Sequence, residues 1–373
     1  MTLVAAYRVG SVPFLISDFL VTADGEERSL EVPAFPNFRL TSGLSAFHVV
    51  QLRRKSFRVW DDLIVAGCDS VAGIAKIFSR LGAHRWPRRD LPSLKEFFER
   101  QSLNPFENCT IVGHLLAAPD NLITFRWHST TGAFDTGECF TEGSGVGLFS
   151  DVVPSVNFGA IRSEEQLEGA IESALHVTTT LYANEARSGN TLEQRMGGGY
   201  DIYTNVGRGF EPVKRVTYLF YACEVRDRNT MRFFSTPLLV QHRLFDQVAF
   251  IRVAGGNAML HPGTDADERV ALAFPLHARK RIPLRDVALD SIPYTSPRYA
   301  IGMIGRTSSG EQEVFTTIVS REEAKQFKIY RTGLMQGSLT EVRFELPDMI
   351  MNNIAKTAGQ RFLRLVPTRP ENA

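Results

Sequence analysis

The chain opens with two apolar runs separated by a tight turn. Residues 3–9 and 12–17 are rich in Val, Ile and Leu, and Gly10-Ser11 lies between them. Two apolar runs joined by a two-residue turn that contains glycine are typical of a β-hairpin. We therefore predict that the protein begins with two buried, antiparallel strands.

Four later stretches space their apolar residues as helices do. Residues 71–81 and 92–101 repeat them every three or four positions. A longer helix opens with the capping-box sequence Ser163-Glu-Glu-Gln166 and closes at Ser188-Gly189. We expect a fourth, amphipathic helix near residues 347–359.

Short apolar segments bounded by turn residues predict the remaining strands. The stretch 23–48 is polar and irregular, so we expect at most one short strand there. Strands and helices come in separate groups along the chain, which favours an α+β fold over a parallel βαβ sheet. The predicted strands cover 56–60, 62–67, 108–117, 121–127, 132–140, 200–204, 213–225, 237–240, 247–254, 268–275, 299–305 and 312–319.

The pattern changes near residue 226, after which strands predominate. A chain of 373 residues exceeds the ~250–300 residues at which a single core usually stops growing. We therefore predict two domains, residues 1–225 and a β-rich C-terminal domain of residues 226–373 whose role the sequence does not indicate. No repeat or linker separates them, so we expect the two to pack together.

Composition and charge exclude several classes of protein. Lys and Arg total 42 and Asp and Glu total 41, so there is no basic excess of the kind that holds proteins to nucleic acid or anionic lipid. The apolar start contains Arg8 and Asp18, which fits neither a signal peptide nor a membrane span. We expect no nucleic acid and no membrane as partners. The basic clusters at 85–89 and 279–281 are interpreted as solvated surface.

Cysteine and histidine spacing gives no sign of a metal or disulfide framework. The cysteines lie far apart without a CxxC pair, and the histidines show no HxH or HExxH spacing. We interpret the cysteines as thiols of a reducing compartment and predict a cytoplasmic protein without a cofactor. The four cysteines are Cys68, Cys109, Cys139 and Cys223.

Thr2 is the candidate catalytic residue. Its small side chain permits removal of Met1, which would leave a threonine with a free α-amine. The hydroxyl could then attack a carbonyl while the amine, with an ordinary pKa of ~7.7–8.0, accepts the proton. A nearby lysine would keep that amine neutral, and a carboxylate would hold the lysine. Lys55, just before an ordered strand, and Asp18, at the end of the second strand, can fill these two roles.

These residues resemble the proteasome β-type subunits and their bacterial relatives among the N-terminal nucleophile hydrolases. In that family the threonine precedes the aspartate by sixteen positions, as Thr2 precedes Asp18 here. The similarity covers residues 1–225. The similar segments are Thr2-Leu-Val-Ala-Ala, Leu15-Ile-Ser-Asp18, Lys55 through Asp62, Val65-Ala-Gly, Glu142-Gly-Ser144-Gly145 and Glu185-Ala-Arg-Ser188-Gly189.

The resemblance implies a fold, an activity and further site residues. It implies a four-layer αββα sandwich, hydrolysis of amide bonds in a peptide or small amide substrate, and assembly into homo-oligomers. Ser144 and Ser188 would relay protons beside Thr2, and Glu185, where the family has aspartate, would orient them. Where the family has its oxyanion-stabilising glycine, this chain reads Ala66-Gly67-Cys68-Asp69-Ser70, so the aligned position is nearer Asp69 and the glycine comes two residues early.

A second class of function also fits the sequence: a catalytically inactive scaffold of the same fold that acts by self-assembly or partner binding. The mass of the N-terminal peptide separates the two, because a retained Met1 leaves no free threonine amine. Met196-Gly-Gly-Gly199 is interpreted as a turn leading into a strand rather than as a ligand loop. His114, His128 and His242 are interpreted as structural or surface residues.

Overall fold

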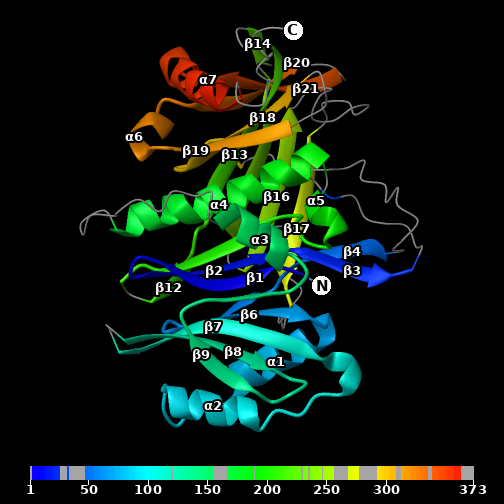
Figure 1. The fold of residues 1–373 in the computed structure, drawn as a ribbon, viewed down its shortest axis with the longest axis vertical. Coiled ribbons are helices and arrows are strands. Elements are labelled where there is room, and N and C mark those ends of the chain that lie inside the picture. Colours follow the sequence, from blue (N-terminus) through cyan, green and yellow to red (C-terminus); the bar gives the residue numbers. More distant parts are fainter. Residues whose placement is uncertain are drawn as a thin grey trace, which may run out of the picture.

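A computed structural model gives the arrangement of most of the chain (Figure 1). The structure describes residues 2–25, 32, 47–118, 121–153, 166–188, 190–207, 209–227, 230–233, 236–245, 247–255, 268–276, 292–307, 312–334 and 338–362. The predicted N-cap at Ser163 lies outside these residues. Within the described part, no helix combines the length and apolar character that crossing a membrane requires.

The first sheet contains the predicted hairpin. β1 (Val4–Val9) and β2 (Val12–Asp18) pair antiparallel, with Gly10 in the left-handed region at φ 59° in the turn. The sheet has the order β10-β1-β2-β11-β12. Its other strands are β10 (Phe140–Glu142), β11 (Tyr200–Asn205) and β12 (Phe210–Pro212).

The second sheet is antiparallel, in the order β5-β6-β7-β8-β9, and the single strand predicted at 132–140 is divided between β9 in this sheet and β10 in the first. The helices α1 (Val71–Ala83) and α2 (Leu91–Glu99) cover its outer face, with η1 (Pro105–Glu107) after them. Apolar side chains such as Phe98 and Trp127 fill the space between helices and sheet. The strands are β5 (Ser56–Trp60), β6 (Leu63–Asp69), β7 (Cys109–Ala118), β8 (Asn121–His128) and β9 (Phe134–Gly137).

The third sheet has nine strands, in the order β19-β18-β13-β15-β16-β17-β4-β3, with β14 paired to β13. It joins distant parts of the chain, because β17 pairs in parallel with β4 through Phe274 and Arg53. Its strands are β3 (Leu20–Asp24), β4 (Phe47–Arg54), β13 (Arg215–Asp227), β14 (Thr230–Phe233), β15 (Leu238–Phe245), β16 (Val248–Gly255), β17 (Arg269–Pro275), β18 (Tyr299–Thr307) and β19 (Gln312–Val319).

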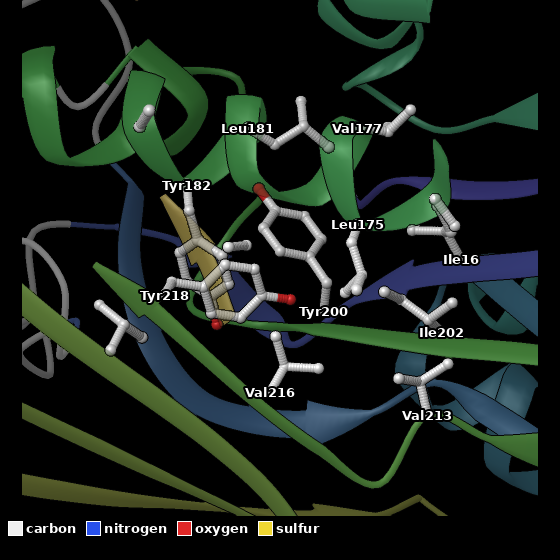
Figure 2. Close-up of a cluster of buried hydrophobic side chains, with 14 of the residues drawn as sticks. Ile16, Leu175, Val177, Leu181, Tyr182, Tyr200, Ile202, Val213, Val216 and Tyr218 are labelled. Atoms are coloured by element: carbon white, nitrogen blue, oxygen red, sulfur yellow. The ribbon is translucent and has the colours of Figure 1, made fainter. Parts of the chain in front are cut away.

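Helices fill the space between the first sheet and the nine-stranded sheet. They are α3 (Val146–Val152), α4 (Gln166–Ser188) and α5 (Asn190–Glu193). Figure 2 shows side chains of α4 meeting those of β2, β11 and β13 in one buried cluster. Tyr182 of α4 lies edge-on to Tyr200 of β11, with ring centroids 5.0 Å apart. The first sheet is therefore covered on both faces, and its end at Asp18 is deeply buried.

The C-terminal elements cover the far side of the nine-stranded sheet (Figure 1). α6 (Arg321–Ala324) precedes the hairpin of β20 (Lys328–Leu334) and β21 (Ser338–Glu345). α7 (Asp348–Phe362) extends over the helix predicted at 347–359. The hairpin of β20 and β21 was not anticipated from the sequence.

The expected four-layer αββα sandwich is wrong. The protein is mostly β, with several large sheets that are mainly antiparallel. The nine-stranded sheet is the cause, because it takes β3 and β4 from the N-terminal part and most of its other strands from beyond residue 225. As a result α4 is enclosed between two sheets instead of forming an outer layer. The division into domains at residue 225 stays a prediction, and β13 runs across it.

Candidate active site

Lys55 lies where the chain passes from one sheet to another. β4, in the nine-stranded sheet, ends at Arg54, and β5, in the second sheet, begins at Ser56. The backbone at this crossing is held by Gly67, whose N–H donates to the Lys55 carbonyl at 3.0 Å. The Lys55 side chain is 2% exposed. A cation buried to this degree requires strong local partners.

The partners of Lys55 include two of the residues predicted from sequence. Its Nζ donates to the Thr2 hydroxyl oxygen, to the Leu20 carbonyl and, at 2.9 Å, to Asp18 Oδ1. The Thr2 hydroxyl in turn donates to Asp18 Oδ1. Thr2 is 1% exposed and Asp18 is fully buried. The structure thus brings Thr2, Asp18 and Lys55 into direct mutual contact.

Backbone N–H groups fix the Asp18 carboxylate in this position. Oδ1 also accepts from the N–H of Leu3 at 2.9 Å. Oδ2 accepts from the N–H groups of Leu20 at 3.1 Å and Gly197 at 3.0 Å. Both oxygens are therefore saturated by donors, which compensates the burial of the charge.

The surroundings of Lys55 shift the pKa of its ammonium below the ordinary value. Burial lowers the pKa of the Lys55 ammonium, and the charge and hydrogen bond of Asp18 oppose that effect without cancelling it. A lysine in this state holds its proton less firmly than an exposed one. It touches a hydroxyl that is a potential nucleophile.

Ser144 lies beside Thr2 but its hydroxyl is turned to another partner. The loop after β10 packs on the Thr2 backbone: Gly145 N–H donates to the Thr2 carbonyl at 3.4 Å. At Gly143, with φ 98°, a Cβ would lie only 1.9 Å from the same oxygen. The Ser144 hydroxyl donates to the Gln194 carbonyl. Its predicted role as a proton relay stays a prediction.

Glu185 reaches the site through backbone groups and does not contact Thr2. Its Oε2 accepts from Gly198 N–H at 3.0 Å and from the Thr191 hydroxyl at 3.4 Å. Gly197, the preceding residue, donates to Asp18. Burial raises the pKa of Glu185 from 4.5 to about 8; its two hydrogen bonds oppose this and the charge of Asp18 adds to it. At pH 7 the carboxyl is therefore mostly protonated.

The glycine run 197–199 is a part of the site that sequence reasoning treated only as a turn. All three residues have positive φ, at 122°, 69° and 134°. A Cβ on Gly197 would lie 2.1 Å from Glu185 Oε2, and one on Gly199 would lie 2.4 Å from the Phe19 ring. Glycine is required here by conformation and by space. Three consecutive glycines just before a strand were the available signal.

Ser188 is the last residue of α4, and its side chain lies outside the described part of the structure. Met1 also lies outside it. Their predicted involvement at the site therefore stays a prediction.

The segment 66–70, which stands where the resembled family has its oxyanion-stabilising glycine, makes other contacts in this structure. The N–H of Gly67 is already bound to Lys55, and a Cβ there would meet Ile74 at 2.8 Å, so this glycine allows α1 to pack closely. Asp69 adopts φ 76°, unusual for a residue with a side chain. Its carboxylate accepts from the Thr110 hydroxyl at 3.1 Å. Thr110 also lies 3.0 Å from His128 Nδ1.

The buried histidines have packing partners. His114 bonds to the Phe14 carbonyl at 2.9 Å and to Thr124 at 3.1 Å. Burial lowers its pKa to about 4, which keeps it neutral. His242 packs against Phe19. Among the residues that the structure describes, no three His, Cys, Asp or Glu side chains are grouped as metal ligands would be.

No protein-family model matches this chain, and neither does any curated protein. Together with the mostly-β architecture, this overturns the assignment to the proteasome β-type subunits and their relatives. The contact among Thr2, Asp18 and Lys55 does not depend on that assignment.

Proposed function

We propose that this protein hydrolyses amide bonds with Thr2 as its nucleophile, after removal of Met1. A peptide or a small amide would be the substrate. The observation that carries the proposal is the buried contact of the Lys55 ammonium with the Thr2 hydroxyl, with Asp18 bound to both. Perturbed, buried charges next to a nucleophilic group are more frequent at functional sites than elsewhere.

In the proposed reaction the Thr2 oxygen attacks the amide carbonyl, and its proton moves to the α-amine of the same residue. The amine then gives this proton to the leaving nitrogen as the C–N bond breaks, which leaves an ester on Thr2. Water hydrolyses that ester and restores the hydroxyl. Lys55 keeps the amine neutral by charge repulsion, and Asp18 holds Lys55 in place.

The test begins with the state of the N-terminus. Mass spectrometry of the N-terminal peptide should show that Met1 is absent. Incubation with a peptide epoxyketone, which reacts with a hydroxyl and a neighbouring amine, should then modify Thr2 of the wild type. Thr2→Ala should abolish the modification. Thr204→Ala is the matched control, because it removes another buried threonine hydroxyl that has no partner among the described residues.

Two results would contradict the proposal: retention of Met1 in the purified protein, or equal modification of the wild type and Thr2→Ala. Either would favour the non-catalytic scaffold. Self-association and a cytoplasmic, reducing location remain part of the proposal. Native mass spectrometry tests the first. The second rests on four widely spaced cysteines, which are all free thiols in this structure.

A further inference from the structure

Asp201 binds the residues on both sides of Lys55. Its carboxylate accepts from Arg54 Nε at 3.0 and 2.9 Å and from the Ser56 hydroxyl at 2.5 Å. Arg54, Ser56 and Asp201 are 3%, 2% and 1% exposed. The three consecutive residues 54–56 therefore contact two buried aspartates: Lys55 contacts Asp18, and its two neighbours contact Asp201.

The side chains at this crossing point in alternate directions. In extended backbone, successive side chains project to opposite faces. Lys55 extends to Asp18 and Thr2, whereas its two neighbours extend to Asp201. Asp201 itself pairs with Ser17 in the β2–β11 ladder, one residue before Asp18. The two aspartates therefore belong to neighbouring strands of a single sheet.

Lys55 belongs to neither strand, and its backbone carbonyl accepts a hydrogen bond from Gly67. It is the single residue between β4 and β5, which belong to different sheets, while Asp201 belongs to the first sheet. The Arg54 contacts are strengthened by the Tyr203 hydroxyl and the Gln247 carbonyl, each 2.6 Å from a guanidinium nitrogen. Asp201, in the first sheet, thus binds the end of β4 in the nine-stranded sheet and the start of β5 in the second sheet, on either side of Lys55.

We propose that Asp201 is a positioning residue for the Thr2 site: by binding Arg54 and Ser56 together it fixes the backbone of Lys55 and directs its Nζ onto the Thr2 hydroxyl. This inference rests on the proposed function for its catalytic meaning, but its structural content can be tested without it. A misplacement of about 1 Å at a reacting group can cost roughly 10²-fold in rate.

Ser56→Ala is the main test variant, because it removes one of the two tethers without changing any charge. Ser17→Ala is the matched control: it is an equally buried serine, opposite Asp201 in the ladder, with no hydrogen-bond partner among the described residues. Asp201→Asn is the stronger variant, although it also removes a charge. All variants are compared with wild type as the full chain.

The first readout follows Lys55 itself by NMR. The chain has eight lysines, so after ¹³C labelling of lysine the Lys55 Cε signal can be identified as the one missing in Lys55→Met. We expect its titration midpoint in Ser56→Ala to move upward, toward that of an exposed lysine, because burial is the largest influence on it in the wild type. Ser17→Ala should leave the midpoint unchanged.

The second readout is the rate at which the peptide epoxyketone modifies Thr2. We expect roughly a tenfold loss in Ser56→Ala, a larger loss in Asp201→Asn and less than about a twofold change in Ser17→Ala. The positioning role is overturned if the Lys55 titration in Ser56→Ala equals that of wild type, or if only Asp201→Asn has an effect, since charge alone would then be responsible. A wild type that does not react refutes the proposed function, and the NMR titration still decides the role of Asp201.

Discussion

Arg54 and Lys55 are adjacent cations and both are almost fully buried, yet their surroundings shift their pKa values in opposite directions. Arg54 directs Nε to both oxygens of Asp201, and Tyr203 and Gln247 accept from its other nitrogens. Burial alone would lower the pKa of Arg54, but the charge and hydrogen bonds of Asp201 outweigh it, and the pKa is raised. The region around Arg54 therefore fixes a permanent charge.

Around Lys55 the negative charge of Asp18 is shared among several hydrogen-bond donors. Asp18 serves Lys55, the Thr2 hydroxyl and three backbone N–H groups at once. Less of its charge is therefore available to the ammonium, and burial lowers the pKa of Lys55. Two buried ion pairs one residue apart thus differ in what they can do. The Arg54–Asp201 pair connects sheets, and the Lys55–Asp18 pair holds a cation against the Thr2 hydroxyl.

The largest effect on the rate of Thr2 modification should come from removing the charge of Lys55. Lys55→Met keeps the length and loses the charge, so the Thr2 amine would no longer be held neutral and oriented. We expect the epoxyketone to modify Thr2 at least ~10³-fold more slowly, measured by intact mass over time. A rate within about tenfold of wild type would show that Lys55 is only a structural residue.

Removing the charge of Arg54 should reduce stability more than removing that of Lys55. Arg54→Met leaves Asp201 buried without its counter-ion, so we expect the free energy of unfolding to fall by about 3–5 kcal/mol, measured by urea denaturation. Lys55→Met should cost less, because backbone N–H groups still bind Asp18. Lys95→Met is the control: its pair with Glu99 is exposed and 3.7 Å long, and should contribute less than about 1 kcal/mol. Equal losses in Arg54→Met and Lys55→Met would remove the distinction between the pairs.

The third prediction concerns pH and Glu185. Its pKa is raised by burial from 4.5 to about 8, so the folded protein keeps a proton that the unfolded chain releases between these values. The stability of wild type should fall as pH rises through this window, by at most about 1.4 kcal/mol per pH unit, and level off above it. Glu185→Gln cannot titrate. The difference in unfolding free energy between the two proteins should therefore grow from pH 5 to pH 8 in favour of the variant, and a constant difference would contradict the assignment.

The smallest effect is expected at Ser144. Because its hydroxyl is bound to the Gln194 carbonyl, Ser144→Ala should cost about 0.5–1.5 kcal/mol of stability and change the rate of Thr2 modification less than about threefold. A proton relay would instead be worth about 10²-fold or more. A loss of that size, measured by the same mass assay, would restore the role expected from the sequence.

The features that could be predicted from sequence are those encoded by residues close together in the chain or required by one reaction. The hairpin of β1 and β2 is encoded by neighbouring apolar residues and a glycine turn, and both strands were predicted nearly to their ends. Thr2, Asp18 and Lys55 could be grouped because one reaction needs an amine, a cation and a carboxylate. Their contact in the structure agrees with that chemical requirement.

The remaining features depend on long-range pairing that no local pattern encodes. Strand β4 joins β17, which lies more than two hundred residues away, and this pairing builds the sheet that makes the expected sandwich wrong. Asp201 meets Arg54 across 147 positions, and Gly197 meets Asp18 across 179. The glycine run marks Gly197 as a special backbone position, but no spacing connects it to Asp18 or Asp201 to Arg54. Their roles follow from proximity in the fold.

The single-residue crossing between β4 and β5 also limits how this protein can change by insertion or deletion. Adding one residue beside Lys55 would reverse the alternation of side chains and turn Arg54 or Ser56, in place of Lys55, toward Thr2. A guanidinium remains charged at any physiological pH, and a serine carries no charge. Length variation at this point would therefore erase the candidate chemistry even if every side chain discussed above were retained.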